Sequence, residues 1–253
     1  MGINQRPRKS KVRFYLFHEF LRASDHESLR DPVTDINFFC FVLFCRALIA
    51  VLGLFIMQQW SGSLAILSYA ELIFNEMKSQ LEGKYLTMIL GGVQVMCTAI
   101  NAFIVDRCNR RTLLLISASG ISISTCLIAL FFFLQYIEVD VSEIAWLPAA
   151  GSILYIVSFS FGLAALPFTM MSEIFPTNVK AVGSMIGMLC CNSSAFAVAL
   201  SYQSIAEQCG IYVAFWFFSL IAALGVIFTY YFVPETRKKT LQEIQEQLHG
   251  YKL

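Results

Sequence analysis

Charged residues and histidine are scarce in this chain of 253 residues. Asp, Glu, Lys and Arg make up 14% of it, where about 25% is usual for a soluble globular protein. The three histidines, His18, His26 and His249, lie outside every long apolar run, and no run holds a Ser/His pair, paired aspartates or a set of metal ligands. We therefore expect no enzyme, no cofactor, no metal site and no nucleic-acid partner.

A cysteine framework and a cleavable signal peptide are missing as well. The eight cysteines include no C-x-x-C pair, and nearly all lie in or beside apolar runs, so we interpret them as packing residues. The stretch "FYLFHEFLRA" after the basic N-terminus is short and is interrupted by His18, Glu19 and Arg22. It is typical of an interfacial amphipathic segment and not of a signal peptide.

Long apolar runs are what the chain has in abundance, with 57% hydrophobic residues. A hydrocarbon core of about 30 Å takes about 20 apolar residues of helix. Five runs fit: 85–105, 113–135, 147–171, 181–203 and 211–233. The run from Phe38 to Phe74 is too long for one crossing, so we place the crossing at about 46–75, with Arg46 at the interface and 38–45 as an interfacial lead-in. The sequence predicts an all-α integral membrane protein with six spans.

The basic residues support an even number of spans. On a six-span topology, all but Lys78 and Lys84 of the 18 basic residues fall on one side, which the positive-inside rule identifies as cytoplasmic. We therefore predict three parts, with both termini in the cytoplasm. They are a basic and amphipathic segment at 1–39, a six-span bundle at 40–233 and a cytoplasmic helix or tail at 234–253.

Four short motifs lie within the spans or at their ends. They are "QQWSG" (58–62) in the first span, "DRCNRR" (106–111) after the second, "SEIFP" (172–176) at the end of the fourth and "PET" (234–236) after the sixth. The basic turn taken alone is also explained by the positive-inside rule. Together and in this order, the motifs resemble the C-terminal half of the sugar porter branch of the major facilitator superfamily, in particular insect facilitated trehalose transporter-like proteins.

This resemblance implies a fold and a function. Such transporters consist of two six-span bundles, which hold the substrate between them at mid-membrane and rock to give alternating access. We expect this chain to supply the C-terminal bundle. Its partners would be a sugar, the lipid bilayer and a second six-span bundle. The expected function is facilitative transport of a hexose or of a disaccharide such as trehalose, and the resemblance implies a location in the plasma membrane.

The resemblance also implies substrate-binding residues. Gln58 and Gln59 are amides at membrane depth, so they must face protein or water. They could simply bond neighbouring helices, but in similar proteins this pair faces the cavity and binds sugar hydroxyls. Gln94, Phe168 and Asn192 complete the expected set, although the usual asparagine aligns more closely with Cys191. Phe168 offers an aromatic face for a sugar ring.

A second set of residues is expected to control gating. Ser61 and Gly62 should loosen the first span, so that its outer part, with Tyr69, bends over the site. By resemblance, the arginines Arg110 and Arg111 pair with the carboxylates of Glu173 and Glu235 on the inner face. Several such pairs together can bias two nearly balanced states.

Departures from the family pattern keep an alternative open. Leu64 replaces a sugar-binding asparagine, and "GLAALPF" (162–168) keeps few of the family's glycines and prolines, which should stiffen the fourth span. The alternative is a non-transporting six-span membrane protein that acts as an assembly partner or regulator. Glu71 near the outer end of the first span raises a further hypothesis, proton coupling, if burial raised its pKa.

Overall fold

The computed structural model describes residues 32–67, 83–105, 107–175, 179–237, 239 and 243. Helices dominate these ranges. They are α2 (Pro32–Trp60), α4 (Gly83–Ile104), α5 (Arg110–Tyr136), the short 3-10 helix η2 (Ser142–Ile144), α6 (Leu147–Phe161), α7 (Leu166–Ile174), α8 (Lys180–Gln208) and α9 (Ile211–Phe232). Of the predicted segment at 1–39, only the start of α2 lies within the described residues.

Six helical stretches are long and apolar enough to cross a membrane. They are Phe44–Leu67, Gly83–Ile104, Arg110–Tyr136, Leu147–Ile174, Lys180–Gln208 and Ile211–Phe232. Five of them match the predicted runs to within a few residues. The first begins at Phe44, close to the predicted 46, and residues 68–75 of that prediction lie outside the described residues. The prediction of an all-α protein with six spans is confirmed.

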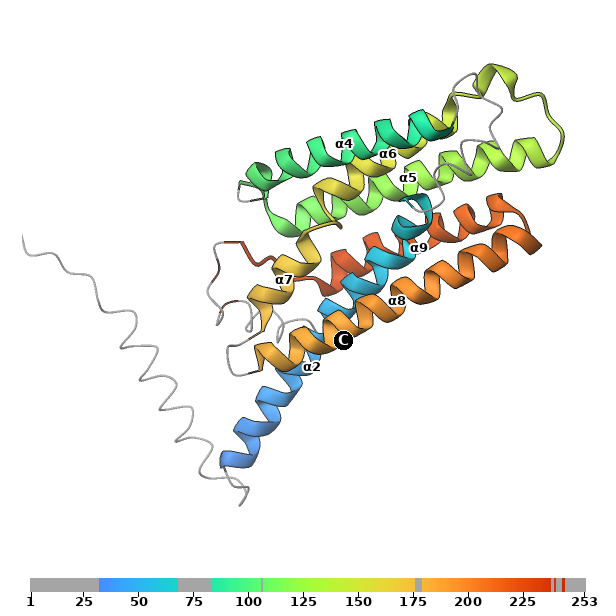
Figure 1. Ribbon diagram of the computed structural model, residues 1–253. Helices are drawn as coiled ribbons and strands as arrows, with labels where there is room; N and C mark the ends of the chain where they lie inside the picture. Colours follow the sequence, from blue (N-terminus) through green and yellow to red (C-terminus); the bar gives the residue numbers. More distant parts are fainter. Residues whose placement is uncertain are drawn as a thin grey trace, which may run out of the picture. The chain divides into compact units, whose positions relative to one another are not determined.

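The chain divides into two compact units, Met1–Val42 and Leu43–Leu253. In the second unit, α5 packs against both α6 and α9, α4 packs against α6, and α8 packs against α7 and α9 (Figure 1). The part of α2 in this unit approaches α9 through small residues. A side chain at Gly53 would overlap the ring of Phe228, and one at Gly225 would overlap Met57. Small residues of this kind let membrane helices pack closely.

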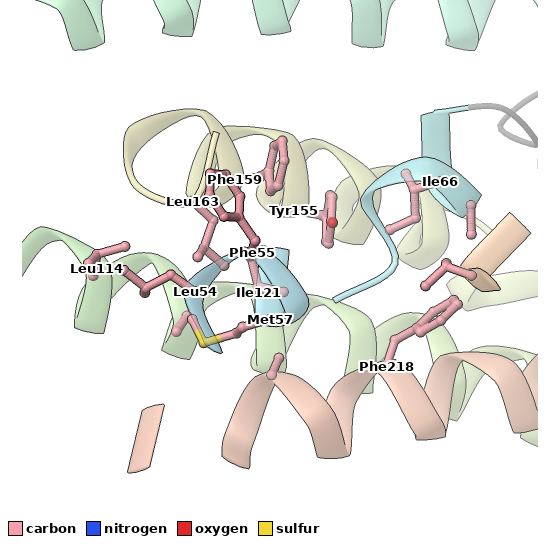
Figure 2. Close-up of a cluster of buried hydrophobic side chains, with 14 of the residues drawn as sticks. Leu54, Phe55, Met57, Ile66, Leu114, Ile121, Tyr155, Phe159, Leu163 and Phe218 are labelled. Atoms are coloured by element: carbon pink, nitrogen blue, oxygen red, sulfur yellow. The ribbon is translucent and has the colours of Figure 1, made fainter. Parts of the chain in front are cut away.

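The core of the second unit includes apolar side chains from α2, α5, α6 and α9, together with residues of α4, α7 and α8. Leu54, Phe55, Tyr155, Ile156 and Phe215 are fully buried. Figure 2 shows Phe55 of α2 close to Phe159 and Leu163. Tyr155 lies further along α6, the helix that also carries Phe159. A packed core therefore holds the residues on either side of Ser61 and Gly62 and of residues 162–165.

The faces of α4 and α8 that point away from this core remain apolar. Met88 and Val95 on α4, and Leu189 and Phe196 on α8, are all more than half exposed. A helix that is apolar on every side is typical of a membrane span or of a helix covered by further protein. These faces therefore suit lipid or additional apolar protein.

Helices α5 and α9 exchange two hydrogen bonds through serine. The Ser122 hydroxyl donates to the Ser219 carbonyl at 3.1 Å, and the Ser219 hydroxyl donates to the Ser122 carbonyl at 3.0 Å. Hydroxyl bonds between helices are common inside membranes, where water does not compete for the groups. The pair fixes the contact between two uninterrupted spans.

Candidate functional site

The first span is interrupted directly after the two glutamines. Helix α2 ends at Trp60, Ser61 and Gly62 form a turn, and residues 63–67 are helical again. Gly62 has φ of +91°, a conformation that glycine adopts at low cost. The Gly62 amide bonds the Gln59 carbonyl at 3.2 Å, a tighter turn than the α-helix. The predicted loosening of the helix at Ser61 and Gly62 is thus confirmed.

Serine hydroxyls donate to the Gln58 carbonyl, which does not receive the Gly62 amide because that amide bonds the Gln59 carbonyl. The Gln58 carbonyl accepts hydrogen bonds from the hydroxyls of Ser61 at 2.9 Å and Ser63 at 3.1 Å. All three residues are buried, so the carbonyl has no access to water and depends on these donors. The first interruption therefore supplies its own hydrogen-bond partners from neighbouring residues.

The fourth span is interrupted as well, between α6 and α7. Residues 162–165 form turns, in which Gly162 and Ala164 both donate to the Phe159 carbonyl, at 3.3 and 2.9 Å. Gly162 lies so close to α5 that an added Cβ would be 2.2 Å from the Ser117 Cβ. We expected the loss of family glycines and prolines to stiffen this span, but the helix is still interrupted at residues 162–165.

Side chains from α5 and α4 bind the backbone around this second interruption. The Ser117 hydroxyl donates to the Ser158 carbonyl at 2.6 Å and accepts the Leu163 amide at 3.2 Å. The Asn101 side chain donates to the Ser160 carbonyl at 2.8 Å. Neither Ser117 nor Asn101 was predicted from the sequence, although an amide at membrane depth such as Asn101 is a recognisable signal of such a contact.

The two glutamines occupy different surroundings. The Gln58 side chain, 5% exposed, donates to the carbonyls of Leu163 at 2.7 Å and Ala164 at 3.3 Å. The Gln59 side chain is partly buried and donates to the Cys191 thiol of α8 at 3.2 Å. Gln58 thus joins the first span to the fourth, whereas Gln59 lies beside the fifth.

Phe168 lies near this pair. Its ring meets Phe55 edge-on, with centroids 5.0 Å apart, and it is 37% exposed. Phe55 belongs to the same helix as the glutamines and precedes Gln58 by three residues, so both lie on one face of α2. The structure therefore brings Gln58, Gln59 and Phe168 to the region where α2, α7 and α8 meet.

Among the described residues, neither Gln94 nor Asn192 forms a hydrogen bond with Gln58 or Gln59. Gln94 is half-buried on the face of α4 that also carries Leu90, Cys97 and Asn101, the buried residues of that helix. Asn192 is exposed, and its side chain donates to the Met188 carbonyl of its own helix at 2.9 Å. Cys191 and not Asn192 contacts Gln59, so the alignment that favoured Cys191 agrees with the observed geometry.

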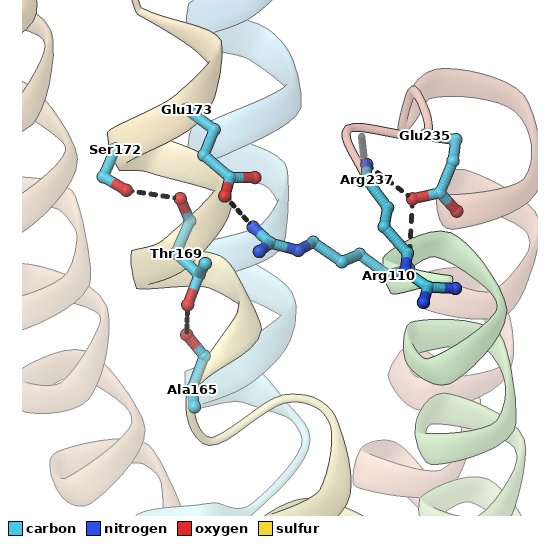
Figure 3. A network of polar contacts seen from close by, with 7 residues as sticks. All are labelled: Arg110, Ala165, Thr169, Ser172, Glu173, Glu235 and Arg237. Atoms are coloured by element: carbon cyan, nitrogen blue, oxygen red, sulfur yellow. Dashed lines mark hydrogen bonds and ion pairs between the residues drawn. The ribbon is translucent and has the colours of Figure 1, made fainter. Parts of the chain in front are cut away.

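An ion pair lies at the end of the bundle where α5 begins and α7 ends. The Arg110 guanidinium contacts the Glu173 carboxylate (Figure 3). The two side chains are 12% and 30% exposed, so water screens the pair only in part. This contact agrees with the expected pairing of Arg110 and Glu173 and connects α5 to α7.

Among the residues that the structure describes, Glu235 binds backbone amides and not a guanidinium. Its carboxylate accepts the amides of Arg110 and Arg111, both at 3.1 Å, and of Arg237 at 3.0 Å. The first two amides belong to the start of α5, where backbone N–H groups lack helical partners and a negative charge is favourable. The expected pairing of Glu235 with the arginine side chains is therefore corrected to a cap of the helix.

Arg111 also departs from the expected ion pair. Among the described residues, its guanidinium donates to the Tyr230 carbonyl and lies over the Tyr230 ring, 5.2 Å from the centroid. Arg237 donates to the Asn109 side chain at 3.4 Å. Asn109 itself is extended, with φ of −69° and ψ of 129°. Tyr69 and Glu71 lie outside the described residues.

Comparisons with known proteins agree with this architecture. A family model described as "Sugar (and other) transporter" matches residues 19–248. The chain is 34% identical over 205 residues to the facilitated trehalose transporter Tret1 of Anopheles gambiae, which covers 81% of this chain and 26% of that protein. It is 33% identical over 205 residues to Tret1 of Polypedilum vanderplanki, covering 81% of this chain and 41% of the relative.

Solved structures show the same fold. The inward-open xylose transporter XylE from E. coli matches with a TM-score of 0.68 and 20% identity, over 93% of this chain and 46% of that one. A double-tryptophan variant of XylE matches with a TM-score of 0.70 and 21% identity, over 80% and 43%. The chain spans less than half the length of the curated relatives it matches. From the family match and the identity to these relatives, the chain belongs to the sugar porter family of the major facilitator superfamily.

Proposed function

We propose that this six-helix bundle binds a sugar and, with a second six-helix bundle, passes it across the membrane by alternating access. The observation that carries the proposal is the meeting of two interrupted spans beside Gln59 and Phe168. Interrupted helices at membrane depth are the usual location of binding sites in secondary transporters, because they present polar groups without breaking the fold. The proposed substrate is a hexose or a disaccharide such as trehalose.

The chemistry of Gln59 suits a sugar hydroxyl. Its side chain can donate and accept hydrogen bonds and carries no charge. Its partner among the described residues, the Cys191 thiol, is a weak acceptor, so a sugar hydroxyl can replace that contact at little cost. The partly exposed ring of Phe168 offers an apolar surface for the C–H face of the same sugar.

Names of the relatives support this substrate class. Several are facilitated trehalose transporters, and a neighbouring structure is described as a proton:xylose symporter bound to a deoxyglucose derivative. We propose facilitative transport for this chain. Uptake that does not respond to an imposed pH gradient is expected, whereas a response would favour coupling to protons through a carboxylate such as Glu71.

Basic residues at one end of the bundle support a cytoplasmic orientation of that end, and an ion pair there supports a gate on the same side. Arg107, Arg110, Arg111, Lys180 and Arg237 all lie near that end, and the positive-inside rule places such an end in the cytoplasm. We propose cytoplasmic termini and a plasma-membrane location. The Arg110–Glu173 pair would hold α7, which follows the second interruption, against α5. Its loss would free α7 to move and open the cytoplasmic side.

Uptake and binding of labelled sugars test the proposal. The full chain, reconstituted in liposomes, is expected to bind labelled hexose or trehalose and to transport it when the second bundle is present. Gln59→Ala should lower affinity about tenfold, the effect of one hydrogen bond worth about 1.4 kcal/mol. Gln203→Ala is the matched control, since Gln203 is exposed and bonds Glu207 on its own helix.

A second candidate function is a non-transporting membrane protein that assists or regulates assembly. It is favoured by Asn192, whose side chain bonds its own helix, and by Gln94, for which the described residues show no hydrogen bond to the glutamine pair. A folded chain that binds no sugar, and in which Gln59→Ala has no effect, would support this candidate and contradict sugar transport.

A further inference from the structure

The end of α7 that carries Glu173 is held on two sides by different chemistry. On one side, the Glu173 carboxylate reaches the Arg110 guanidinium of α5 (Figure 3). On the other side, Phe175, the residue that follows α7, is only 2% exposed. At its other end, α7 is joined to α6 by the turns at residues 162–165. The contacts at the Glu173 end therefore bear directly on whether α7 stays in place.

The Phe175 ring lies between α2 and α8. Helix α7 ends at Ile174, and Phe175 is extended, with φ of −81° and ψ of 130°. Its ring centroid is 5.8 Å from that of Phe44 on α2. On α8, a Cβ added to Gly183 would be 2.9 Å from the Phe175 ring. The missing side chain at Gly183 thus makes room for the ring, as small residues do between membrane helices.

The next turn of α8 receives α7 in the same way. Gly187 follows Gly183 by four residues, so the two lie on one face of the helix, and both are buried. A Cβ added to Gly187 would be 3.2 Å from the Met171 Sδ of α7 and 3.1 Å from the Phe55 ring of α2. Helix α7 therefore packs along a strip of α8 that has no side chains at two successive turns.

The two contacts at the end of α7 differ in strength. The Arg110–Glu173 pair is partly exposed, so water and salt screen it. Phe175 follows Glu173 by two residues, close to that solvent, so movement of α7 away from α2 and α8 would expose the ring to water. Exposure of a buried phenyl ring costs more free energy than loss of a screened ion pair. The apolar contact is therefore the stronger restraint.

We propose that Phe175 is a positioning residue whose ring, seated between Phe44 and Gly183, is the main latch that holds α7 against α2 and α8. The Arg110–Glu173 pair is the weaker restraint. For transport, the inference rests on the proposed function, in which movement of α7 opens the bundle on the side of Glu173. Loss of the ring then favours the conformation that is open on that side.

Hydrogen exchange of the purified full chain in detergent, without sugar, tests the latch. Phe175→Ala should speed exchange of the backbone amides at 170–174 about tenfold or more, because local opening of α7 no longer exposes a ring. Phe196→Ala is the matched control, since it removes an exposed ring from α8 and should change these rates less than about twofold. Glu173→Gln should speed them by about threefold at most. Phe175→Leu keeps an apolar side chain and should restore most of the protection.

A double-mutant cycle with Gly183 tests where the ring is seated. Gly183→Ala places a Cβ against the Phe175 ring, so it should speed exchange at 170–174 in the wild-type background. In the Phe175→Ala background the ring is absent, so Gly183→Ala should have almost no effect. Gly91→Ala on α4 is the control for the change of glycine to alanine, because nothing lies within 4 Å of a Cβ at that position.

Transport kinetics in the presence of the second bundle test the functional half. Phe175→Ala should raise the KM for sugar supplied from the outer side and lower the KM for sugar supplied from the side of Glu173, because the population shifts towards the conformation open on that side. Phe175→Leu should return both values towards the wild type. A residue that only stabilised the fold would lower Vmax through the amount of protein and would not move the two KM values in opposite directions.

Three outcomes would overturn the proposal. They are equal exchange at 170–174 in Phe175→Ala and Phe196→Ala, a larger effect of Glu173→Gln than of Phe175→Ala, and an effect of Gly183→Ala that persists without the ring. If Phe175→Ala unfolds the whole bundle, seen as fast exchange in α5 and α9 as well, the same comparisons are made with Phe175→Leu, which should still speed exchange at 170–174 more than Phe196→Leu does.

Failure of the proposed function would be recognised separately. A wild-type chain that neither binds nor transports sugar refutes sugar transport. The exchange measurements use no sugar, so they would still decide whether Phe175 holds α7 in place.

Discussion

The interruptions of the first and fourth spans satisfy their backbone groups in different ways. At the first, the hydroxyls of Ser61 and Ser63 bind the carbonyl of Gln58, a few residues away. At the second, the donors and acceptors come from Ser117 on α5, Asn101 on α4 and Gln58 on α2. The first interruption is therefore specified by its own sequence, and the second by the assembly of the bundle.

This difference bears on how each interruption can change. A turn that carries its own partners can alter its angle without losing them. A turn that depends on three other helices loses hydrogen bonds when those helices separate, and each lost bond leaves a buried group unsatisfied. We expect the first interruption to tolerate motion and the second to respond to the packing around it.

Substitution of Gly62 should have the largest effect. An alanine there would adopt an unfavourable positive φ and place its Cβ 2.6 Å from the Phe218 ring. Gly62→Ala should lower the free energy of unfolding by about 2–4 kcal/mol, as measured by chemical denaturation in micelles. Gly92→Ala is the control, because nothing lies within 4 Å of a Cβ at that helical position. Similar stabilities for the two variants would contradict a first interruption fixed by backbone conformation.

Ser117→Ala should have the next largest effect. It removes the acceptor of the buried Leu163 amide and the donor to the Ser158 carbonyl, at a cost of about 1–3 kcal/mol. The measurement is the free energy of unfolding, together with faster hydrogen exchange at residues 162–165. Ser119→Ala on the same helix should be within about 0.5 kcal/mol of the wild type, since its hydroxyl bonds only its own helix. If Ser117→Ala and Ser119→Ala had the same stability, the second interruption would not depend on these distant partners.

The serines of the first interruption should be redundant. Ser61 and Ser63 donate to the same carbonyl, so Ser61→Ala or Ser63→Ala alone should cost about 0.5 kcal/mol. The double variant should cost about 1–2 kcal/mol, more than the sum of the two, because the Gln58 carbonyl then has neither donor. Strictly additive free energies of unfolding would show that the hydroxyls act independently and would weaken the contrast with the second interruption.

Removal of the Arg110–Glu173 pair should have the smallest effect on stability. Glu173→Gln should cost about 0–1 kcal/mol, because the pair is partly exposed and screened. A double-mutant cycle with Arg110→Gln measures the pairwise term, which should shrink at high salt. A pairwise term that is large and insensitive to salt would mean that the pair anchors the second interruption and does not act as a readily broken contact.

Features that depend on local sequence were predicted well. The six spans follow from the length and hydropathy of each run, and the interruption at Ser61 and Gly62 follows from residues within the turn itself. The persistence of the second interruption was not predicted, because Ser117 and Asn101 lie more than 40 residues away from it in sequence. Nothing in the local composition of "GLAALPF" indicates that such partners exist.

The candidate site was predicted in part for a similar reason. That Gln58 and Gln59 face protein or water follows from amides placed in an apolar span, but the partner of Gln58, the Leu163 carbonyl, lies in another span and is not visible in the local sequence. The cap formed by Glu235 was mistaken for an ion pair, because side-chain charges are visible in a sequence and unpaired amides at a helix start are not. The gathering of five sugar residues was expected, and the structure brings together three.

The reciprocal serine contact between α5 and α9 limits which helices can slide. Each hydroxyl donates to the carbonyl of the other residue, so a shift of either helix by a single residue along its axis would separate both donors from both acceptors at once. The register of this pair therefore has one favourable setting. Rearrangements that keep both bonds must therefore move the other helices relative to α5 and α9, which would keep the same alignment with each other.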